Sequence, residues 1–394
     1  NSEDFAFAPC GTIRTMQPQW RRFARGAVGA SATMDPVAQG AVAGWVHEYT
    51  SARERNTMGW LGGVFDSVQQ WLFESVLQPL MFTTGLASLL ENGYEASGWL
   101  LVGLLQLVVI VAVIGPMQRW WPVEPINDRA TIRTDILYTL IHRLGLFRLA
   151  LFFTVDPLAD SLFGALRVAG VSTFQLDGIW PGVTDISWVS LLLYLVVFDF
   201  VDYWIHRGQH HFEWWWRLHS LHHAQQQMTM WSDNRNHLLD DLLRDVILVT
   251  VAQLIGVAPG QFIAIVAITQ LSESFQHANV RLWFGQVGER LWISPRFHRR
   301  HHSIGIGHET VKPSTEATSG QPATPPRVVL GGHNFGVLLP WWDMLMGTAN
   351  FEKRFDPTGV RDQVEPGPDG RVRDYGRGFW SQQWRGVLRL LGKA

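Results

Sequence analysis

The stretch from His206 to His223 reads HRGQHHFEWWWRLHSLHH and contains six histidines in eighteen residues. It directly follows an apolar run at residues 187–205, SWVSLLLYLVVFDFVDYWI, which approaches the length needed to cross a bilayer. The sequence therefore passes from a membrane-like segment straight into a run of imidazoles, and the spacing of those imidazoles decides which fold and chemistry it can support.

The histidines are spaced in a helical pattern. Thirteen of the fifteen lie between residues 206 and 333. On a helix, positions i, i+3 and i+4 share one face, so each HxxHH motif directs three imidazoles into one small volume. Imidazole binds iron, zinc, copper and nickel, so the spacing predicts a site for two metal ions without selecting the metal. The motifs are HxxxH at His206 and His210, HxxHH at His219, His222 and His223, and HxxHH at His298, His301 and His302.

The composition favours a membrane protein. Apolar residues make up 47% of the chain and charged residues 17%, against about 25% in soluble domains. The twenty tryptophans suit a membrane interface. A net charge of −2 gives no basic field, so nucleic acid is not an expected partner. The single cysteine, Cys10, excludes an internal disulfide and a cysteine-ligated zinc site.

Five apolar runs are candidates for membrane segments. Residues 98–115 form the clearest one, and the run at 246–271 is broken by GVAPG, which predicts a hairpin dipping into the membrane. The weaker runs fit a buried helix of a soluble protein equally well. Arginines after Ile205 and Leu271 place the histidine segments on the cytoplasmic side. The remaining runs are 71–90, 137–155 and 187–205.

These patterns predict an all-α, multi-pass helical membrane protein with a cytoplasmic-side helical cap that holds a histidine-rich dimetal site. Residues 1–40 lack the apolar core of a secretory signal peptide, and we expect either a flexible leader there or sequence upstream of a true start near Met34. The loop at 311–327 is rich in Pro, Ser and Thr and is expected to be disordered. The expected parts are a partly disordered tail at 1–60, membrane helices at 61–186, a catalytic domain at 187–350 and a tail at 351–394.

The order of these motifs resembles the fatty acid hydroxylase superfamily, also called the sterol desaturase family. The resemblance covers about residues 187–350. It implies an integral-membrane di-iron enzyme that uses O₂ and two external electrons to hydroxylate or desaturate a C–H bond of a lipid. The matching segments are DFVDYWIHRGQHHFEWWWRLHSLHH, FQHANVRL, SPRFHRRHHS and HNFGVLLPWWDMLMGT.

The resemblance also implies which residues bind the metals, with no catalytic residue beyond these ligands. His277 matches the isolated histidine between the second and third motifs. His237 matches a His-Pro-x-Asp element, although Leu238 replaces the proline. The ten expected ligands are His206, His210, His219, His222, His223, His237, His277, His298, His301 and His302.

The other histidines are not expected to bind metal. His211 follows a ligand position and points about 100° away from it on a helix, so we expect it at the membrane interface. His308 is expected on the surface, at the start of the loop. His333 begins the HNFG segment and is left out of the site, while His47 and His142 lie far upstream of the motifs.

Five carboxylates lie near the histidines in sequence. Asp199, Asp202 and Glu273 stand seven or four residues before a ligand, so each could accept the second N–H of its ring. Glu273 could also bind metal directly. Asp240 and Asp343 match family positions without an assigned role. Ordinary salt-bridge or helix-end carboxylates are the alternative for all five.

The expected protein is a lipid oxygenase of the bacterial inner membrane, or of the endoplasmic reticulum in a eukaryote. Two iron ions are its expected cofactors, although zinc can displace iron during purification. Its electrons would come from a separate ferredoxin or cytochrome with its reductase. A zinc-dependent membrane hydrolase and a non-catalytic metal-binding or transport protein are the alternatives. The sequence leaves open which lipid is the substrate, whether the product is hydroxylated or desaturated, and the oligomeric state.

Overall fold

The computed structural model describes residues 60–312, 327–367 and 370–393. These residues belong to two compact units, one ending at Gly98 and the other starting at Trp99. The expected tail at 1–59, with His47, lies outside the described residues. In the first unit, Phe73 and Tyr94 pack edge to face with ring centroids 5.3 Å apart. Its elements are α3 (Trp60–Leu72), η2 (Phe73–Leu77), α4 (Gln78–Thr83), η3 (Ala87–Leu89) and the start of α5 (Leu90–Val109).

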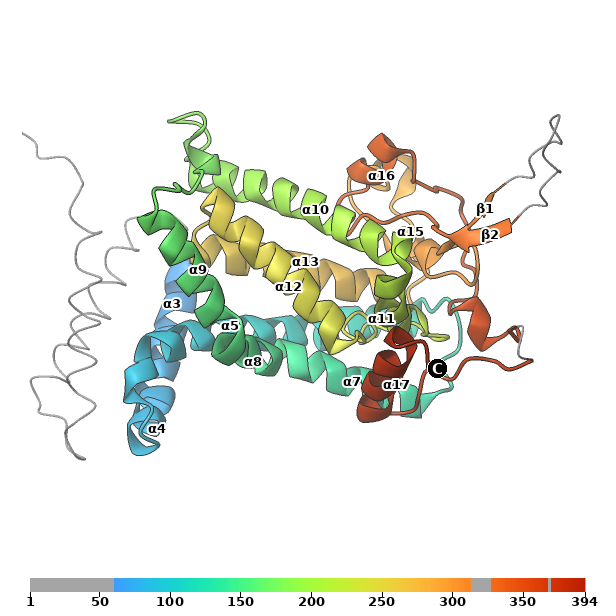
Figure 1. The fold of residues 1–394 in the computed structure, drawn as a ribbon, viewed down its shortest axis with the longest axis horizontal. Helices are drawn as coiled ribbons and strands as arrows, with labels where there is room; N and C mark the ends of the chain where they lie inside the picture. The colour runs from blue at the N-terminus through green and yellow to red at the C-terminus, as the bar shows by residue number, and fades with distance from the viewer. Residues whose placement is uncertain (1–59, 313–326, 368–369, 394) are drawn as a thin grey trace, which may run out of the picture. The chain divides into compact units, whose positions relative to one another are not determined.

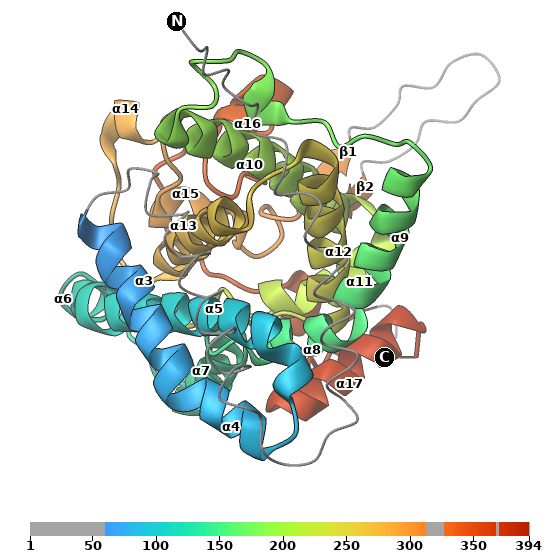
Figure 2. The ribbon, with the colours of Figure 1, turned by 90° about the vertical axis from the view of Figure 1, so that its left-hand side faces the viewer.

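The second unit is built around three long helices. Figures 1 and 2 agree that α12 and α13 lie between α10 and α7. Buried side chains of α10, α12 and α13, such as Phe198, Leu248 and Ile265, form the apolar core between them. The helices of this part are η4 (Ile110–Ile114), α6 (Gly115–Trp120), α7 (Arg129–Arg143), α8 (Leu146–Thr154), α9 (Asp156–Val168), η5 (Leu176–Gly178), α10 (Ser187–His211), α12 (Leu238–Ile255) and α13 (Pro259–His277).

Local sequence explains where the long helices end. Gly256 adopts a φ of 73°, which glycine reaches without strain, and it terminates α12. Pro259 then occupies the first turn of α13, where its missing N–H is no loss. The GVAPG segment thus turns one apolar run into two antiparallel helices. As a result, the end of α13 and the start of α12 lie at the same end as the end of α10.

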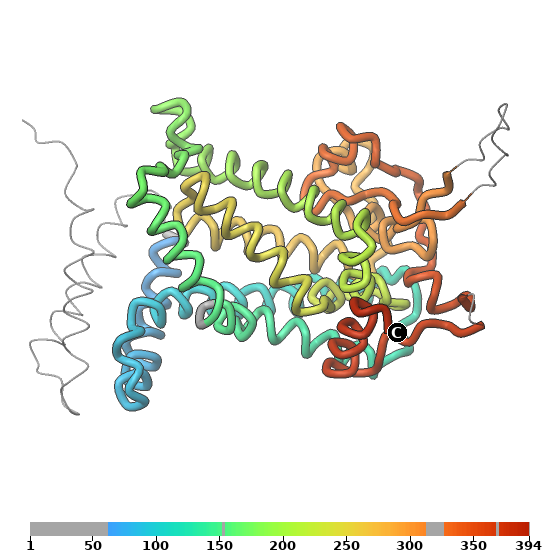
Figure 3. The backbone as a smooth tube through the Cα atoms, in the orientation of Figure 1, coloured from blue at the N-terminus to red at the C-terminus, as the bar shows by residue number. Residues whose placement is uncertain are grey.

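Shorter elements gather at that end, as the backbone trace in Figure 3 shows. They include a two-stranded antiparallel sheet in which Lys312 pairs with Arg327. The chain is therefore mostly helical rather than all-α, and residues 311, 312 and 327 of the expected loop are in strands. Residues 313–326 lie outside the described part. The elements are α11 (Glu213–His223), α14 (Gly285–Gly288), α15 (Pro295–His301), β1 (Glu309–Lys312), β2 (Arg327–Leu330), α16 (Trp341–Met346), η6 (Arg361–Gln363) and α17 (Phe379–Leu390).

Two helical segments among the described residues are long and apolar enough to cross a membrane, namely Ala87–Trp120 and Ser187–His211. The other expected runs are interrupted. Residues 71–90 divide into several short helices, Gly145 separates α7 from α8, and Gly256 separates α12 from α13. Multi-pass topology and a cytoplasmic site stay predictions.

Candidate metal centre

Nine of the ten expected ligand histidines converge at the end of the three long helices, and all nine are buried. His206 and His210 lie on the last two turns of α10, and His277 is the last residue of α13. The second motif ends α11. The third begins on α15 and ends at its C-cap, His302. Ser294 caps the start of α15 by accepting a hydrogen bond from the Phe297 N–H at 3.1 Å, and Pro295 lies in the first turn. Ordinary helix signals thus place each motif.

The first group of histidines offers nitrogen atoms that all lie within 4.8 Å of one another. The His301 ring lies beside this group, with its centroid 4.4 Å from that of His206 and 4.6 Å from that of His210. The group consists of His206, His210, His219 and His223.

The second group is tighter. The Nε2 atoms of His222 and His277 lie 3.1 Å apart, as do those of His277 and His298, and those of His298 and His302. The same 4.8 Å limit holds for all four residues, and His302 also meets His223 and His301 in a third set of three. The two groups are therefore adjacent, because this third set contains His223 of the first group and His302 of the second.

Main-chain carbonyls and one carboxylate orient the rings. Nδ1 of His206 donates to the carbonyl of Phe335 at 2.8 Å, and Nδ1 of His301 to that of His333 at 2.8 Å. Nδ1 of His277 donates to the carbonyl of Glu273 at 2.8 Å. A carbonyl oxygen can only accept, so in each ring Nδ1 carries the proton and Nε2 keeps its lone pair for a metal.

Burial keeps five of the imidazoles in the neutral form. Burial, and then repulsion from neighbouring imidazoles, lowers the pKa of His222, His223, His298, His301 and His302 well below its ordinary value. A neutral imidazole is the form that binds metal. Each of these five neutral rings thus keeps one proton and offers one nitrogen lone pair to a metal.

The same atoms test whether metal fits. Among the described residues, the buried nitrogens Nε2 of His206, His219 and His301 have no hydrogen-bond partner, and neither nitrogen of His210 or His223 has one. Such buried polar atoms are costly unless something binds them. Bonds of about 2.1 Å place two nitrogens about 3.0 Å apart at a right angle and about 3.4 Å apart at a tetrahedral angle. The observed 3.1 Å separations in the second group fall in this range, so that group fits one metal ion. The unpartnered nitrogens of the first group, all within 4.8 Å of one another, leave room for another.

His237 does not join the other nine, and the prediction that it binds metal needs correction. Its Nε2 donates to the carbonyl of Gln383 at 2.8 Å, and its Nδ1 accepts the Leu239 N–H at 3.2 Å as the N-cap of α12. Both ring nitrogens are therefore occupied. Gly386 packs so closely against the ring that a Cβ there would collide with it. His237 joins α12 to α17 and is not in our proposed ligand set.

Replacing His237 with alanine is expected to lower the free energy of unfolding without changing the metal content. The loss of the cap should cost about 0.5–2 kcal/mol. Denaturant unfolding and metal analysis of the purified variant measure the two quantities. His237→Asn, which can still cap α12, should recover part of the stability. Loss of one metal ion from both variants would return His237 to the ligand set.

Two histidines outside the motifs lie closer to the centre than expected. His308 was expected on the surface, but it is 1% exposed and its ring stacks on Trp216 with centroids 5.0 Å apart. Its centroid lies 5.5 Å from that of His223. His333 contributes its carbonyl to His301, as described above. His211 is exposed and His142 hydrogen-bonds to Asp241 at 3.0 Å, so both lie outside the two groups.

The side chains of Asp199, Asp202 and Glu273, which were expected to orient histidine rings, do not hydrogen-bond to them. Asp199 accepts the N–H groups of Leu338 and Leu339 at 2.7 and 3.2 Å. Asp202 accepts Nε of Arg244 at 2.9 Å. The partner of His206 is instead a main-chain carbonyl. Glu273 acts on His277 through its carbonyl and not through its carboxylate. Asp202 is thus an ordinary salt-bridge carboxylate, whereas Asp199 holds the main chain of another segment and fits neither expectation.

Asp240 is the carboxylate that does orient a ring. Its Oδ2 accepts Nδ1 of His219 at 2.9 Å, while its Oδ1 accepts Nε2 of Gln209 at 2.8 Å and Nε1 of Trp215 at 2.6 Å. Asp343 shapes the HNFG segment by accepting the N–H groups of Phe335 and Gly336 at 2.8 and 2.7 Å. The sequence had pointed to Asp240 and Asp343 as family positions, but it did not predict what either carboxylate binds.

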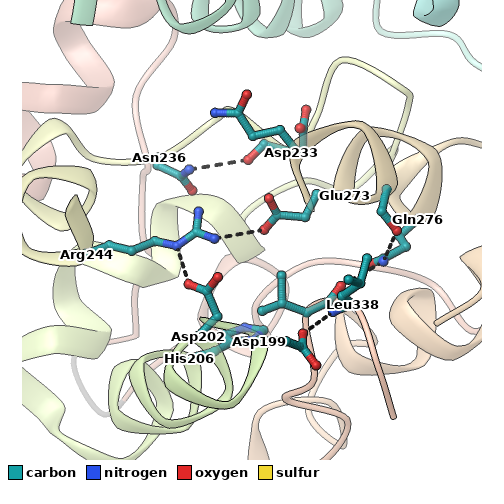
Figure 4. A network of polar contacts seen from close by, with 12 residues as sticks. Asp199, Asp202, His206, Asp233, Asn236, Arg244, Glu273, Gln276 and Leu338 are labelled. Atoms are coloured by element: carbon teal, nitrogen blue, oxygen red, sulfur yellow. Dashed lines mark hydrogen bonds and ion pairs between the residues drawn. The ribbon is translucent and has the colours of Figure 1, made fainter. Parts of the chain in front are cut away.

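A cavity of about 160 Å³ adjoins the histidines. Its wall includes histidines from both groups, among them His206 and His298, and apolar side chains such as Phe198 and Phe262. The wall also includes a polar network that contains Asp202, Arg244 and Glu273 (Figure 4). Burial raises the pKa of Glu273 to about 7 and that of Asp245, another wall residue, to about 6.

Comparison with known proteins agrees with this geometry. Residues 191–348 match the family model described as fatty acid hydroxylase. Over 290 residues the chain is 26% identical to a Rhizobium tropici protein named ornithine lipid hydroxylase OlsE, an alignment that covers 72% of this chain and 76% of that relative. No solved structure matches the chain.

Proposed function

We propose, from the membership of residues 191–348 in the fatty acid hydroxylase superfamily, that this chain is a membrane-bound, iron-dependent lipid hydroxylase. One observation carries the proposal. Nine buried histidines present unpartnered or mutually facing nitrogens in two adjacent groups, beside a cavity with an apolar wall. The proposed ligands are His206, His210, His219, His223 and His301 in one group and His222, His277, His298 and His302 in the other.

The proposed reaction inserts one oxygen atom into a C–H bond. A substrate R–H, one O₂, two electrons and two protons give R–OH and H₂O. Bound iron would supply the activation of O₂, because among the metals that imidazole binds it changes redox state readily. The electrons would come from a separate donor protein. Desaturation would start with removal of the same hydrogen, so hydroxylation is proposed here from the name of the relative.

The chain's own residues hold the site in place. Phe335 contributes its carbonyl to His206, and its ring packs against His210 and His301 with centroids 5.3 and 5.8 Å away. The apolar wall beyond the site excludes water and gives a lipid tail a favourable environment. Ser187–His211, a candidate membrane span, ends at the histidines and so connects the bilayer to the site.

Protein purified from iron-replete cells is expected to contain about two iron ions per chain, since nine ligands exceed what one ion can bind. Metal analysis by mass spectrometry gives the stoichiometry, and Mössbauer spectra of ⁵⁷Fe-grown protein should show a coupled pair. O₂ consumption must depend on lipid and on reductant.

Active protein that holds stoichiometric zinc and no iron would favour the hydrolase alternative and overturn the proposal. Zinc in inactive protein would not, because zinc lies above iron in the Irving–Williams order and can displace it during purification. Restoring activity by removing zinc and adding iron separates these two cases.

A further inference from the structure

The wall of the cavity beside the histidines changes in character along two helices, α10 and α13. Along α10, apolar Phe198 is followed four residues later by Asp202 and then by His206. Along α13, Phe262 and Ile265 precede Glu273, which precedes His277 by four residues. Four residues are about one helical turn, or roughly 6 Å. The wall thus changes from apolar to charged to metal-binding, in the same order on both helices.

The charged layer centres on one arginine and two carboxylates, which Figure 4 shows facing one another. Arg244 of α12 donates from Nε to Asp202 at 2.9 Å. Its Nη2 lies 3.7 Å from Oε1 of Glu273, which is too long for a hydrogen bond. The Asp202 carboxylate therefore has a hydrogen bond from the guanidinium, whereas the Glu273 carboxylate has only a longer electrostatic contact with it.

The layer and its surroundings hold more acids than cations. The other arginines of the wall are each paired with their own carboxylate, Arg143 with Asp233 at 2.9 Å and Arg148 with Asp156 at 3.2 Å. Asp241 pairs with His142, and Asp240 accepts hydrogen bonds from Gln209, Trp215 and His219. Among the described residues that line the cavity, Glu273 and Asp245 are the carboxylates with neither a cation nor another donor at hydrogen-bond distance. The cavity is therefore short of positive charge at the level of the charged layer.

An uncharged acyl chain is a poor occupant of this layer. Methylene groups placed against the half-buried Arg244 and Glu273 would strip the remaining water from these charges and give no hydrogen bond in return, which is costly. A head group with an ammonium and a carboxylate would instead pair with Glu273 and with Arg244. Its tail would continue into the apolar layer, where burial is favourable.

On the basis of the proposed hydroxylase function, we propose that this charged layer binds the head group of an amino-acid lipid, with its ammonium at Glu273 and its carboxylate at Arg244. The reacting carbon then belongs to the head group. The histidine layer lies one helical turn from the charged layer, so a carbon within a few bonds of the bound charges reaches it. A carbon far along the tail would lie on the opposite side.

Binding to the metal-free protein tests the charged layer without reference to turnover. The probes are N-palmitoyl-ornithine and N-palmitoyl-norvaline, which have the same tail, carboxylate and side-chain carbons and differ in the terminal ammonium. The full chain in phosphatidylcholine nanodiscs should bind the ornithine probe about tenfold or more tightly, because a buried charged hydrogen bond is lost with norvaline. Glu273→Gln should reduce this preference to about threefold or less.

The control variant is Glu365→Gln, which alters an exposed glutamate that pairs with Arg361 at 3.0 Å, away from the cavity. It should keep the full preference. Equal affinity of the unaltered protein for the two probes would overturn the proposal. So would an equal preference in the unaltered protein and in Glu273→Gln.

The position of the new hydroxyl group separates this proposal from the proposed function. Fragmentation of the product of the iron-loaded protein should place the added oxygen on the ornithine part. Oxygen found on the palmitoyl chain would overturn the head-group proposal and leave the hydroxylase function standing. If the iron-loaded protein with a working electron donor oxidises no lipid in a total extract, the proposed function itself fails.

Discussion

Replacing His222 or His301 with alanine is expected to abolish turnover and to remove metal from one of the two groups. His222 presents Nε2 to that of His277 at 3.1 Å, and His301 is held by the carbonyl of His333 so that its Nε2 faces the first group. Loss of a residue that only orients a ligand lowers metal affinity about 10–100-fold, and loss of the ligand itself should cost at least as much. Metal titration of chelator-treated protein gives the affinity, and lipid-dependent O₂ consumption gives the turnover.

Both variants should still insert in the membrane, because the apolar helices are unchanged. His211→Ala is the matched control. His211 is adjacent to His210 in sequence but exposed and outside both groups, so this variant should keep its metal and its activity. His308 would be a poor control, since it is buried beside His223. Two metal ions in His222→Ala, or loss of metal in His211→Ala, would show that the ligands are wrongly assigned.

Sequence spacing predicted the arrangement of the motifs because that arrangement is local. The i, i+3, i+4 pattern needs only a helix, and Ser294 with Pro295 or Gly256 with Pro259 mark where helices start and stop. The resemblance to the fatty acid hydroxylase superfamily rested on the same local text, and the family match confirms it. The hydrogen bonds that hold the motifs against the rest of the chain could not be predicted in the same way, because they depend on contacts between segments that are distant in sequence.

The partners of the rings show this limit. Three of the orienting groups are main-chain carbonyls, of Phe335, His333 and Glu273, and a carbonyl has no sequence signature. Placing Asp202 four residues before His206 suggested a hydrogen bond along one helix. The Asp202 carboxylate instead accepts a hydrogen bond from Arg244 of another helix, because a hydrogen bond from a charged guanidinium is stronger than one from a neutral imidazole.

His237 and His308 were misplaced for a related reason. A histidine side chain that caps a helix is uncommon, so the caps that sequence suggests are Ser, Thr, Asp and Asn. The contact with Gln383 that completes the role of His237 comes from the C-terminal helix, 146 residues later. For His308, the neighbouring Pro- and Ser-rich text suggested the surface. The strand pair β1–β2 instead begins directly after it and keeps it against Trp216.

The second large effect is expected from Asp240→Asn, through a change in the proton on His219. The carboxylate of Asp240 accepts three hydrogen bonds, two at Oδ1 and one at Oδ2. An amide has one accepting oxygen and one donating NH₂ group. If the NH₂ group replaced Oδ1, it would face the donors of Gln209 and Trp215, so the amide is expected to place it towards Nδ1 of His219.

In that orientation, Nδ1 of His219 must accept a hydrogen bond, so the proton moves to Nε2 and the lone pair that faces the first group is lost. We expect the affinity of that group for metal to fall about 10–100-fold, with turnover falling in proportion at limiting iron. Asp241→Asn is the matched control, because it removes a carboxylate from the same first turn of α12 but contacts His142, which lies in neither group. Its metal affinity should stay within about twofold of that of the unaltered protein, since the outer partners of the ligands are intact. If the two variants titrate alike, His219 does not bind metal through Nε2, and the first group needs another ligand.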